Sequence, residues 1–170
     1  MTVTGLPSFW SMMIWGLLAT VAMTTILQGA QGMGLSRLSL PFLAGTFFIG
    51  DRRWAVIVGF VFYVIGGWLF AFLYFLLFAS LGLYTWWLGA VMGLLHGLFL
   101  LAAGLPLLPY IHPRMASEYD GATAVRQLEP PGFMGLNYGH RTPVTTLLGQ
   151  AVYGAVLGGL PQLQELLQRG

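Results

Sequence analysis

The sequence predicts an all-α integral membrane protein in which four transmembrane helices form a bundle. Hydrophobic residues make up 57% of the 170 residues and charged residues only 7%, whereas a soluble domain has roughly 25% charged residues. The mean hydropathy is +0.78. Four apolar stretches meet or approach the length of about 20 residues that an α-helix needs to cross a bilayer. Lipid must therefore cover the apolar surface that one compact chain cannot bury in its own core.

The expected spans, within a single domain over residues 1–170, are residues 9–31, 54–80, 85–108 and 143–160. The first is uncharged, and Trp10 and Trp15 near its start fit the aromatic belt of a membrane interface. The second is longer than a bilayer requires, which predicts either a tilted helix or a helix end that lies at the interface. The uncharged link between the second and third spans is short, so these two helices should be antiparallel neighbours.

An apolar segment over residues 35–50 follows the first span. Pro41, Gly45 and Gly50 interrupt this segment, and it is too short to span a bilayer. We expect it to lie at the membrane interface, with a re-entrant segment as the alternative.

The long polar loop over residues 109–142 leaves the membrane between the third and fourth spans. Ser117 and Asp120 have the spacing of a helix-capping pair, which predicts a short surface helix toward Leu128.

Six of the seven arginines follow the first or the third span; they are Arg37, Arg52, Arg53, Arg114, Arg126 and Arg141. Positively charged loops tend to stay in the cytoplasm, so we expect these loops to be cytoplasmic and both termini to lie outside. Arg114, Arg126 and Arg141 are expected to contact the phosphates of lipid headgroups. The arginines are spread thinly rather than clustered on one face, which argues against nucleic-acid binding.

Glycines predict where the helices pack. Gly89, Gly93 and Gly97 recur every fourth residue in the third span, and Gly154 and Gly158 have the same spacing in the fourth. Small residues let helix backbones approach closely, and in lipid this approach drives association. The pattern does not distinguish packing within one chain from packing against another subunit.

His96, near the middle of the third span, is the candidate cofactor ligand. An imidazole at this depth can ligate haem or chlorophyll, relay protons, or form a hydrogen bond with a neighbouring helix. No second histidine lies at a similar depth to complete a metal or bis-histidine haem site, so the hydrogen bond is the preferred interpretation and the default is no cofactor.

Two polar stripes offer partners for His96. Thr20, Thr24 and Gln28 recur every fourth residue in the first span, and a second stripe in the fourth span consists of Thr146, Gln150 and Tyr153. If both face inward, they form a polar seam of interhelical hydrogen bonds. No Asp, Glu, Lys or Arg lies within an expected span, which argues against ion-coupled transport.

The remaining chemistry gives no catalytic residue. The chain has no cysteine, which excludes thiol catalysis and cysteine-bound metals. His112 and His140, with Glu118 or Asp120, lack the spacing of a metal-binding motif, so no metal site is predicted. No nucleophile elbow or phosphate-binding loop is present, and we therefore expect a protein that is not an enzyme.

Two segments carry a resemblance to known proteins. LSLPFLAGTFF with DRRWA, and HPRMASEYDGATAVRQLEPPGFMGLNYGHRTP, resemble an uncharacterised family of small four-helix bacterial inner-membrane proteins. The resemblance covers most of the chain and implies a location in the bacterial inner membrane. It brings no catalytic residues.

The sequence has many residues suited to helix packing and few that could catalyse a reaction, which favours a non-catalytic accessory or scaffold subunit. We expect it to pack against itself or within a larger membrane complex, with an energy-transducing complex as one candidate. The first alternative is a haem- or chlorophyll-binding protein that uses His96 as an axial ligand. The second is a small-solute transporter or channel along the polar seam.

Overall fold

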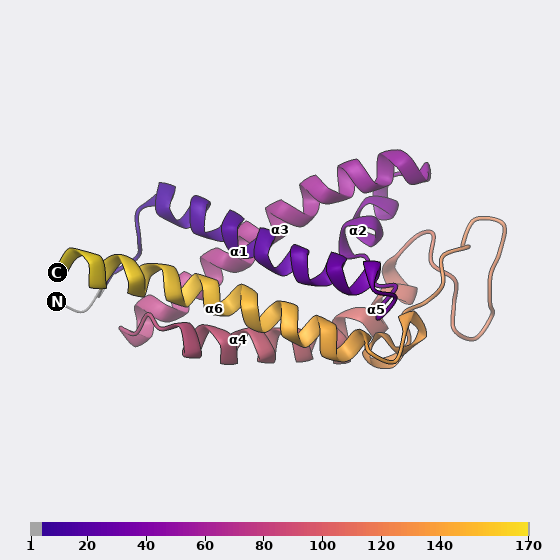
Figure 1. Cartoon of the computed structure of the whole chain (residues 1–170). Helices are drawn as coiled ribbons and strands as arrows, with labels where there is room; N and C mark the ends of the chain where they lie inside the picture. The colour runs from indigo at the N-terminus through magenta and orange to yellow at the C-terminus, as the bar shows by residue number, and fades with distance from the viewer. Residues whose placement is uncertain (1–4, 170) are drawn as a thin grey trace. The chain divides into compact units, whose positions relative to one another are not determined.

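The computed structural model describes residues 5–169, and four of its helices are long and apolar enough to cross a membrane (Figure 1). These candidate spans are Phe9–Gly32, Arg52–Leu81, Trp86–Ile111 and Thr142–Gln164. The prediction of an all-helical chain with four such helices is therefore confirmed. Residues 1–4 and 170, and with them the extreme termini whose sidedness we predicted, lie outside the described residues.

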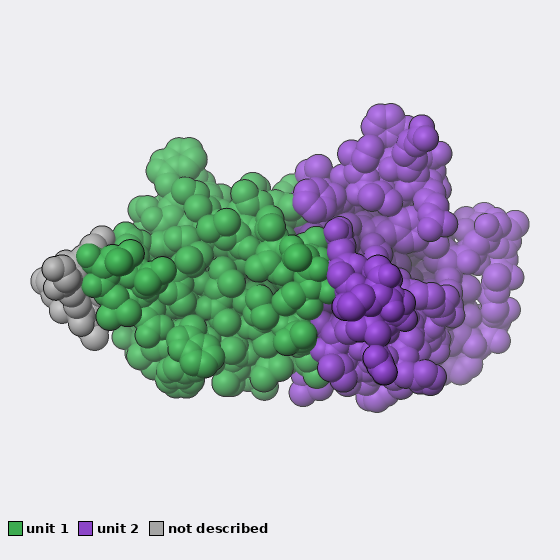
Figure 2. Space-filling view, in the orientation of Figure 1, with its two compact units in different colours: residues 1–26, 64–97, 147–170 green, residues 27–63, 98–146 purple. Residues whose placement is uncertain are grey.

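The residues group into two compact units (Figure 2). Unit 1 comprises residues 1–26, 64–97 and 147–170, and unit 2 comprises residues 27–63 and 98–146. We describe each unit by itself. The expectation of a single domain stays a prediction.

Unit 1 contains most of helix α1 (Phe9–Gly32), the second half of α3 (Arg52–Leu81), most of α4 (Trp86–Phe99) and most of α6 (Thr142–Arg169). Its core consists mainly of aromatic and aliphatic side chains that are 1% exposed or less: Ala19, Ala71, Phe75, Phe78, Tyr153 and Leu157.

The turn between α3 and α4 makes these helices antiparallel neighbours, as predicted. Gly82 adopts a left-handed conformation (φ +63°), and its N–H donates to the Ala79 carbonyl oxygen at 3.2 Å. A glycine in this conformation commonly ends a helix, since it has no Cβ to clash. Within unit 1, the His96 ring of α4 lies 4.2 Å from the ring of Phe70 on α3.

The third candidate span changes its helical geometry partway. Helix α4 passes into a π-helical turn, η1 (Leu100–Gly104), and then into α5 (Leu105–Ile111). The Leu105 N–H donates to the Leu100 carbonyl oxygen, which is the wider spacing of a π-helix. Pro106 follows at once and has no N–H to donate, so a regular α-helix would leave a carbonyl without its partner here. The wider turn lets the helix continue past the expected end at residue 108.

Helix α6 also continues beyond its expected end at residue 160. Pro161 lies inside the helix rather than ending it. A proline removes one backbone hydrogen bond. In lipid, ending the helix would leave more backbone groups unpaired at a higher free-energy cost, so the helix continues.

Unit 2 contains a short helix, α2 (Leu40–Phe48), within the segment expected at the interface. The Ser39 side chain accepts the Phe42 N–H at 3.4 Å and caps its first turn. Nine residues rise about 14 Å, which is too short to cross a bilayer. A Cβ atom placed on Gly45 would lie 1.7 Å from the Ala55 carbonyl oxygen, so α2 and α3 touch backbone to backbone.

The expected surface helix from Ser117 toward Leu128 does not form. Ser117 accepts the N–H groups of Tyr119 and Asp120 at 3.1 and 3.2 Å, as a capping residue would. Gly121 then turns the chain back with a φ of +74°, and Leu128 pairs with Met115 in an isolated β-bridge. The prediction was wrong because a capping residue satisfies a tight turn as well as a helix.

Candidate functional site

The polar loop folds into an ordered structure of its own in unit 2. Its chain buries Met115, Ala116, Pro131 and Tyr138, and it ends in the 3₁₀ helix η2 (Phe133–Tyr138). We call residues 112–141, together with residues 33–39 that they contact, the loop cap.

An ion pair fastens the two parts of the loop cap. Arg37 makes two contacts with the Glu129 carboxylate: Nη1 to Oε2 at 2.9 Å and Nη2 to Oε1 at 3.2 Å. Arg37 Nη2 also donates to the Asn137 carbonyl oxygen at 2.5 Å, and the Arg37 N–H donates to the Tyr138 carbonyl oxygen at 2.7 Å. Both charged side chains are largely exposed, so this pair fixes the geometry of the cap more than it adds stability.

Buried polar contacts complete the fastening. The hydroxyl groups of Ser36 and Thr142 lie 2.9 Å apart, both buried. The Tyr138 hydroxyl donates to the Glu129 carbonyl oxygen at 2.7 Å. Burial raises the pKa of Tyr138 to about 12, with the Glu129 charge adding to this effect and Arg37 opposing it. The phenol therefore stays a neutral hydrogen-bond donor at physiological pH.

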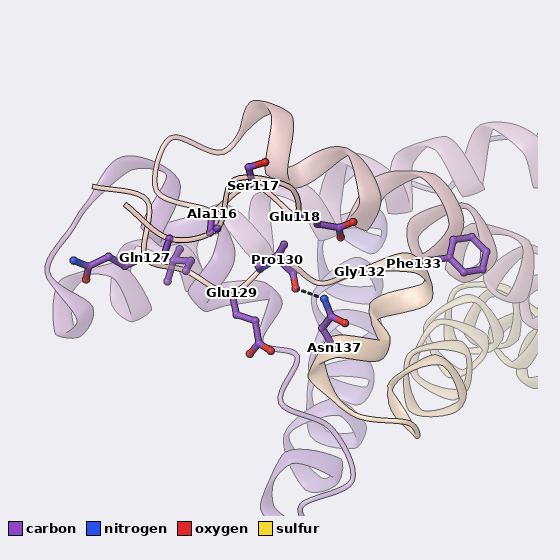
Figure 3. Close-up of a pocket in the computed structure, with 12 residues that line it drawn as sticks. Ala116, Ser117, Glu118, Gln127, Glu129, Pro130, Gly132, Phe133 and Asn137 are labelled. Carbon is purple, nitrogen blue, oxygen red and sulfur yellow. Dashed lines mark hydrogen bonds between the residues drawn. The ribbon is translucent and has the colours of Figure 1, made fainter. Parts of the chain in front are cut away.

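A groove opens on the loop cap, and Figure 3 shows the residues that line it. We call it the cap groove. Its volume is about 680 Å³. The wall contains Glu118, Gln127, Glu129 and Asn137 beside the apolar side chains of Leu128 and Phe133. Asn137 Nδ2 donates to the Pro130 carbonyl oxygen at 3.0 Å, which holds one wall in place (Figure 3). The groove therefore combines acceptor groups with an apolar surface.

His112 and Arg114 hold the end of helix α2. The His112 ring is 1% exposed, and its Nδ1 accepts the Arg114 backbone N–H at 3.2 Å. Nε2 therefore carries the proton and donates to the Leu43 carbonyl oxygen at 3.1 Å. Burial, the largest effect, lowers the pKa of His112; the Leu43 carbonyl raises it and the Arg114 charge lowers it further. The ring is a neutral structural link.

The three arginines expected at lipid headgroups lie in different surroundings. Arg114 Nη1 donates to the carbonyl oxygens of Thr46 and Phe47 at 2.6 and 3.2 Å, so part of its guanidinium caps α2. Arg141 is exposed, and Arg126 is half-buried beside a smaller cavity of about 310 Å³.

His96 is half-buried in unit 1. Its Nδ1 lies 3.4 Å from the Tyr74 hydroxyl oxygen, and its ring packs against Phe70. Tyr74 belongs to α3 and is not among the seam residues that we expected to bond His96.

The glycines of α4 and α6 lie at very short backbone separations in unit 1. A Cβ placed on Gly93 would lie 2.0 Å from the Gln150 carbonyl oxygen, and one on Gly158 would lie 2.2 Å from the Thr85 carbonyl oxygen. At Gly97 the nearest atoms are side-chain carbons of Gln150 and Leu147 at 3.1 Å, a looser contact. Gly89 and Gly154 face each other.

The polar seam residues divide between buried and exposed positions. In unit 1, Thr20, Gln150 and Tyr153 are buried, and Thr24 is half-buried. The threonine hydroxyls donate to carbonyl oxygens of their own helix, at Gly16 and Thr20, and the Tyr153 hydroxyl donates to the Gly67 carbonyl oxygen at 2.5 Å.

In unit 2, Thr146 is buried and Gln28 is exposed. The Gln28 side chain therefore does not join a buried seam.

Sequence reasoning missed the Arg37–Glu129 pair, the cap groove and the capping of α2 by Arg114. The ion pair and the cap of α2 join residues far apart in the chain, and the groove depends on how the loop over residues 116–137 folds, so no local spacing signals any of them. In residues 5–169, no three His, Cys, Asp or Glu side chains gather in a way that could hold a metal ion.

Comparisons with known proteins give no match: no family model, no curated protein and no solved structure matches this chain. The resemblance to a family of small four-helix bacterial membrane proteins therefore stays a prediction.

Proposed function

We propose that this protein is a non-catalytic accessory or scaffold subunit of a larger membrane protein complex. The cap groove carries the proposal. Loops longer than about 12–15 residues are usually either disordered or functional, and this one buries a core of its own and holds an open groove of about 680 Å³. A connection that only joined two helices would need neither feature.

The helices support the same proposal. Helix α3 is the least buried of the four candidate spans, with 17% of its apolar stretch buried. Its exposed surface is available to lipid or to helices of another subunit. An energy-transducing complex of the bacterial inner membrane is one candidate setting, with the loop cap facing the cytoplasm and both termini outside.

Purification in mild detergent tests this proposal. We expect a particle heavier than the 18.6 kDa chain on light scattering, after correction for detergent. Phe133→Asp places a charge in the cap groove and should reduce the particle to the monomer. Val125→Asp is the matched control, because Val125 is also exposed (71% against 66% for Phe133) but does not line the groove. A wild-type protein that runs as a lone monomer contradicts the proposal, as does a complex that both variants retain.

We propose haem or chlorophyll binding at His96 as the second candidate function. The Tyr74 hydroxyl occupies Nδ1, which leaves Nε2 for axial ligation, and ligating histidines commonly bond a second group through their other nitrogen. A Soret or chlorin band in the purified protein, lost in His96→Ala and kept in His140→Ala, is the expected result. A colourless protein, or a band that survives His96→Ala, contradicts this candidate.

A further inference from the structure

Three arginines lie where α2 ends and α3 begins, in unit 2. Arg52 and Arg53 open α3 and are exposed. Arg114 reaches the same turn from the loop cap, because its Nε would lie 3.3 Å from a Cβ placed on Gly50. We call Arg52, Arg53 and Arg114 the arginine corner.

Carboxylates do not neutralise this corner. In the described part of the chain, the salt bridge that forms is between Arg37 and Glu129. Asp51 is the acidic neighbour in sequence, and its Oδ1 accepts the Trp54 N–H at 3.0 Å as the cap of α3. The corner therefore has three arginines and one aspartate, so its net charge is positive.

The corner also has unused hydrogen-bond donors. Arg114 uses Nη1 to cap α2, and no described residue accepts a hydrogen bond from its Nε or Nη2. The Arg52 guanidinium lies 5.5 Å from the centre of the Phe42 ring, a cation–π contact that occupies none of its N–H donors. Guanidinium groups with free donors match the geometry of phosphate oxygens.

Exposed aromatic residues stand at the same two helix ends, since Phe48 is the last residue of α2 and Trp54 is the third residue of α3. Phe48 and Trp54 are 55% and 59% exposed, and Phe47 is also exposed. The close approach of Gly45 to Ala55 fixes α2 against α3, so the aromatic and charged groups keep their places. A soluble anion would use the arginines alone, whereas a phospholipid presents a phosphate beside acyl chains and would use both.

We propose that the arginine corner binds the phosphate of an acidic phospholipid whose acyl chains lie along Phe48 and Trp54. The site shares Arg114 with the headgroup contacts expected from sequence, but it includes Arg52 and Arg53 in place of Arg126 and Arg141. It also does not depend on the proposed subunit role, because the isolated chain should bind the lipid.

Thermal unfolding of the full-length protein in neutral detergent tests the site. Adding phosphatidylglycerol should raise Tm more than adding phosphatidylcholine, because a ligand of the folded state stabilises it. In R52Q/R53Q this difference should fall at least twofold. R126Q/R141Q removes the same charge elsewhere in unit 2 and should keep the full difference. Arg114 stays unchanged in both variants because it also caps α2.

Three results would overturn the proposal. One is a full phosphatidylglycerol effect in R52Q/R53Q, and another is an equal loss in R126Q/R141Q, which would show a general charge effect. The third is an equal rise in Tm with inorganic phosphate alone, which would show an anion site without lipid selectivity. If R52Q/R53Q does not fold, the single variant Arg53→Gln replaces it. Native mass spectrometry should then show that this variant retains fewer phosphatidylglycerol molecules than the wild type. An unchanged number also overturns the proposal.

Discussion

Gly89 of α4 and Gly154 of α6 meet backbone to backbone: a Cβ atom placed on either glycine would lie 1.9 Å from the carbonyl oxygen of the other. No side chain fits at that separation. Because water does not drive helices together within lipid, such close approach supplies van der Waals contact that larger residues would prevent. Gly89 and Gly154 therefore mark a point where the backbones of α4 and α6 touch in unit 1.

Gly89→Ala should force α4 and α6 apart and lower the free energy of unfolding by about 1–3 kcal/mol, the usual cost of overpacking. Gly66→Ala on α3 is the control, since nothing lies within 4 Å of a Cβ at that position. It should leave stability unchanged or raise it by up to about 1 kcal/mol through helix propensity. Thermal unfolding in one detergent compares the two. Equal losses in both variants would show that the contact does not matter.

Gln150 carries a buried oxygen atom, Oε1, that has no hydrogen-bond partner among the described residues. Gln150→Met keeps the approximate volume and removes this acceptor, so it should raise the free energy of unfolding by about 1–3 kcal/mol. Tyr153→Phe, one turn along α6, removes a hydroxyl that does bond, to Gly67, and should lower it by about 1 kcal/mol. A loss of stability in Gln150→Met would mean that the amide has a partner in the assembled protein.

His112 predicts acid sensitivity in unit 2. Its pKa is lowered in the folded protein, so the unfolded chain takes up the proton first as the pH falls. The stability that neutral His112 contributes is therefore fully present above about pH 6.5, the pKa of histidine in the unfolded chain, and declines below it. Tm measured from pH 7.5 to 5.0 should fall, and His112→Gln should flatten this dependence. His140→Gln, an exposed position, should keep it; if it flattens the curve as much as His112→Gln does, the assignment to His112 fails.

Met134 is the non-glycine residue with positive φ in the described structure (φ +57°). Side chains strain this conformation, so Met134→Gly should raise the free energy of unfolding by about 1 kcal/mol. Leu136→Gly, two residues along η2, has no such strain to relieve and should lower it by about 0.5–1 kcal/mol. Denaturation of the purified protein followed by tryptophan fluorescence distinguishes the two signs. A loss at Met134 would show that its side chain contributes more than the strain costs.

The four helices could be predicted because a span is a local property: length and apolar composition suffice. The helix ends at Ile111 and Arg169 could not be predicted. Whether a helix continues past Pro106 or Pro161 depends on its local geometry, which composition does not encode. Ser117 shows the same limit in the loop, where the capping interaction formed and the helix did not.

The site residues divide along the same line. The glycines of α4 and α6 could be recognised by their spacing. Arg37 and Glu129 are 92 residues apart, and neither sequence position suggests the other. The role of Arg114 depends equally on α2 being folded beside it, because part of its guanidinium also caps this helix.

Labelling from the two sides of the membrane tests our proposal that four helices span the bilayer and leave the loop cap in the cytoplasm. The chain has no cysteine, so single variants Val125→Cys in the loop cap and Leu83→Cys in the α3–α4 turn each carry one thiol. With a membrane-impermeant maleimide, Leu83→Cys should react in right-side-out vesicles and Val125→Cys only in inverted ones. The proposed topology is wrong if both variants react from the same side, or if Val125→Cys reacts in right-side-out vesicles.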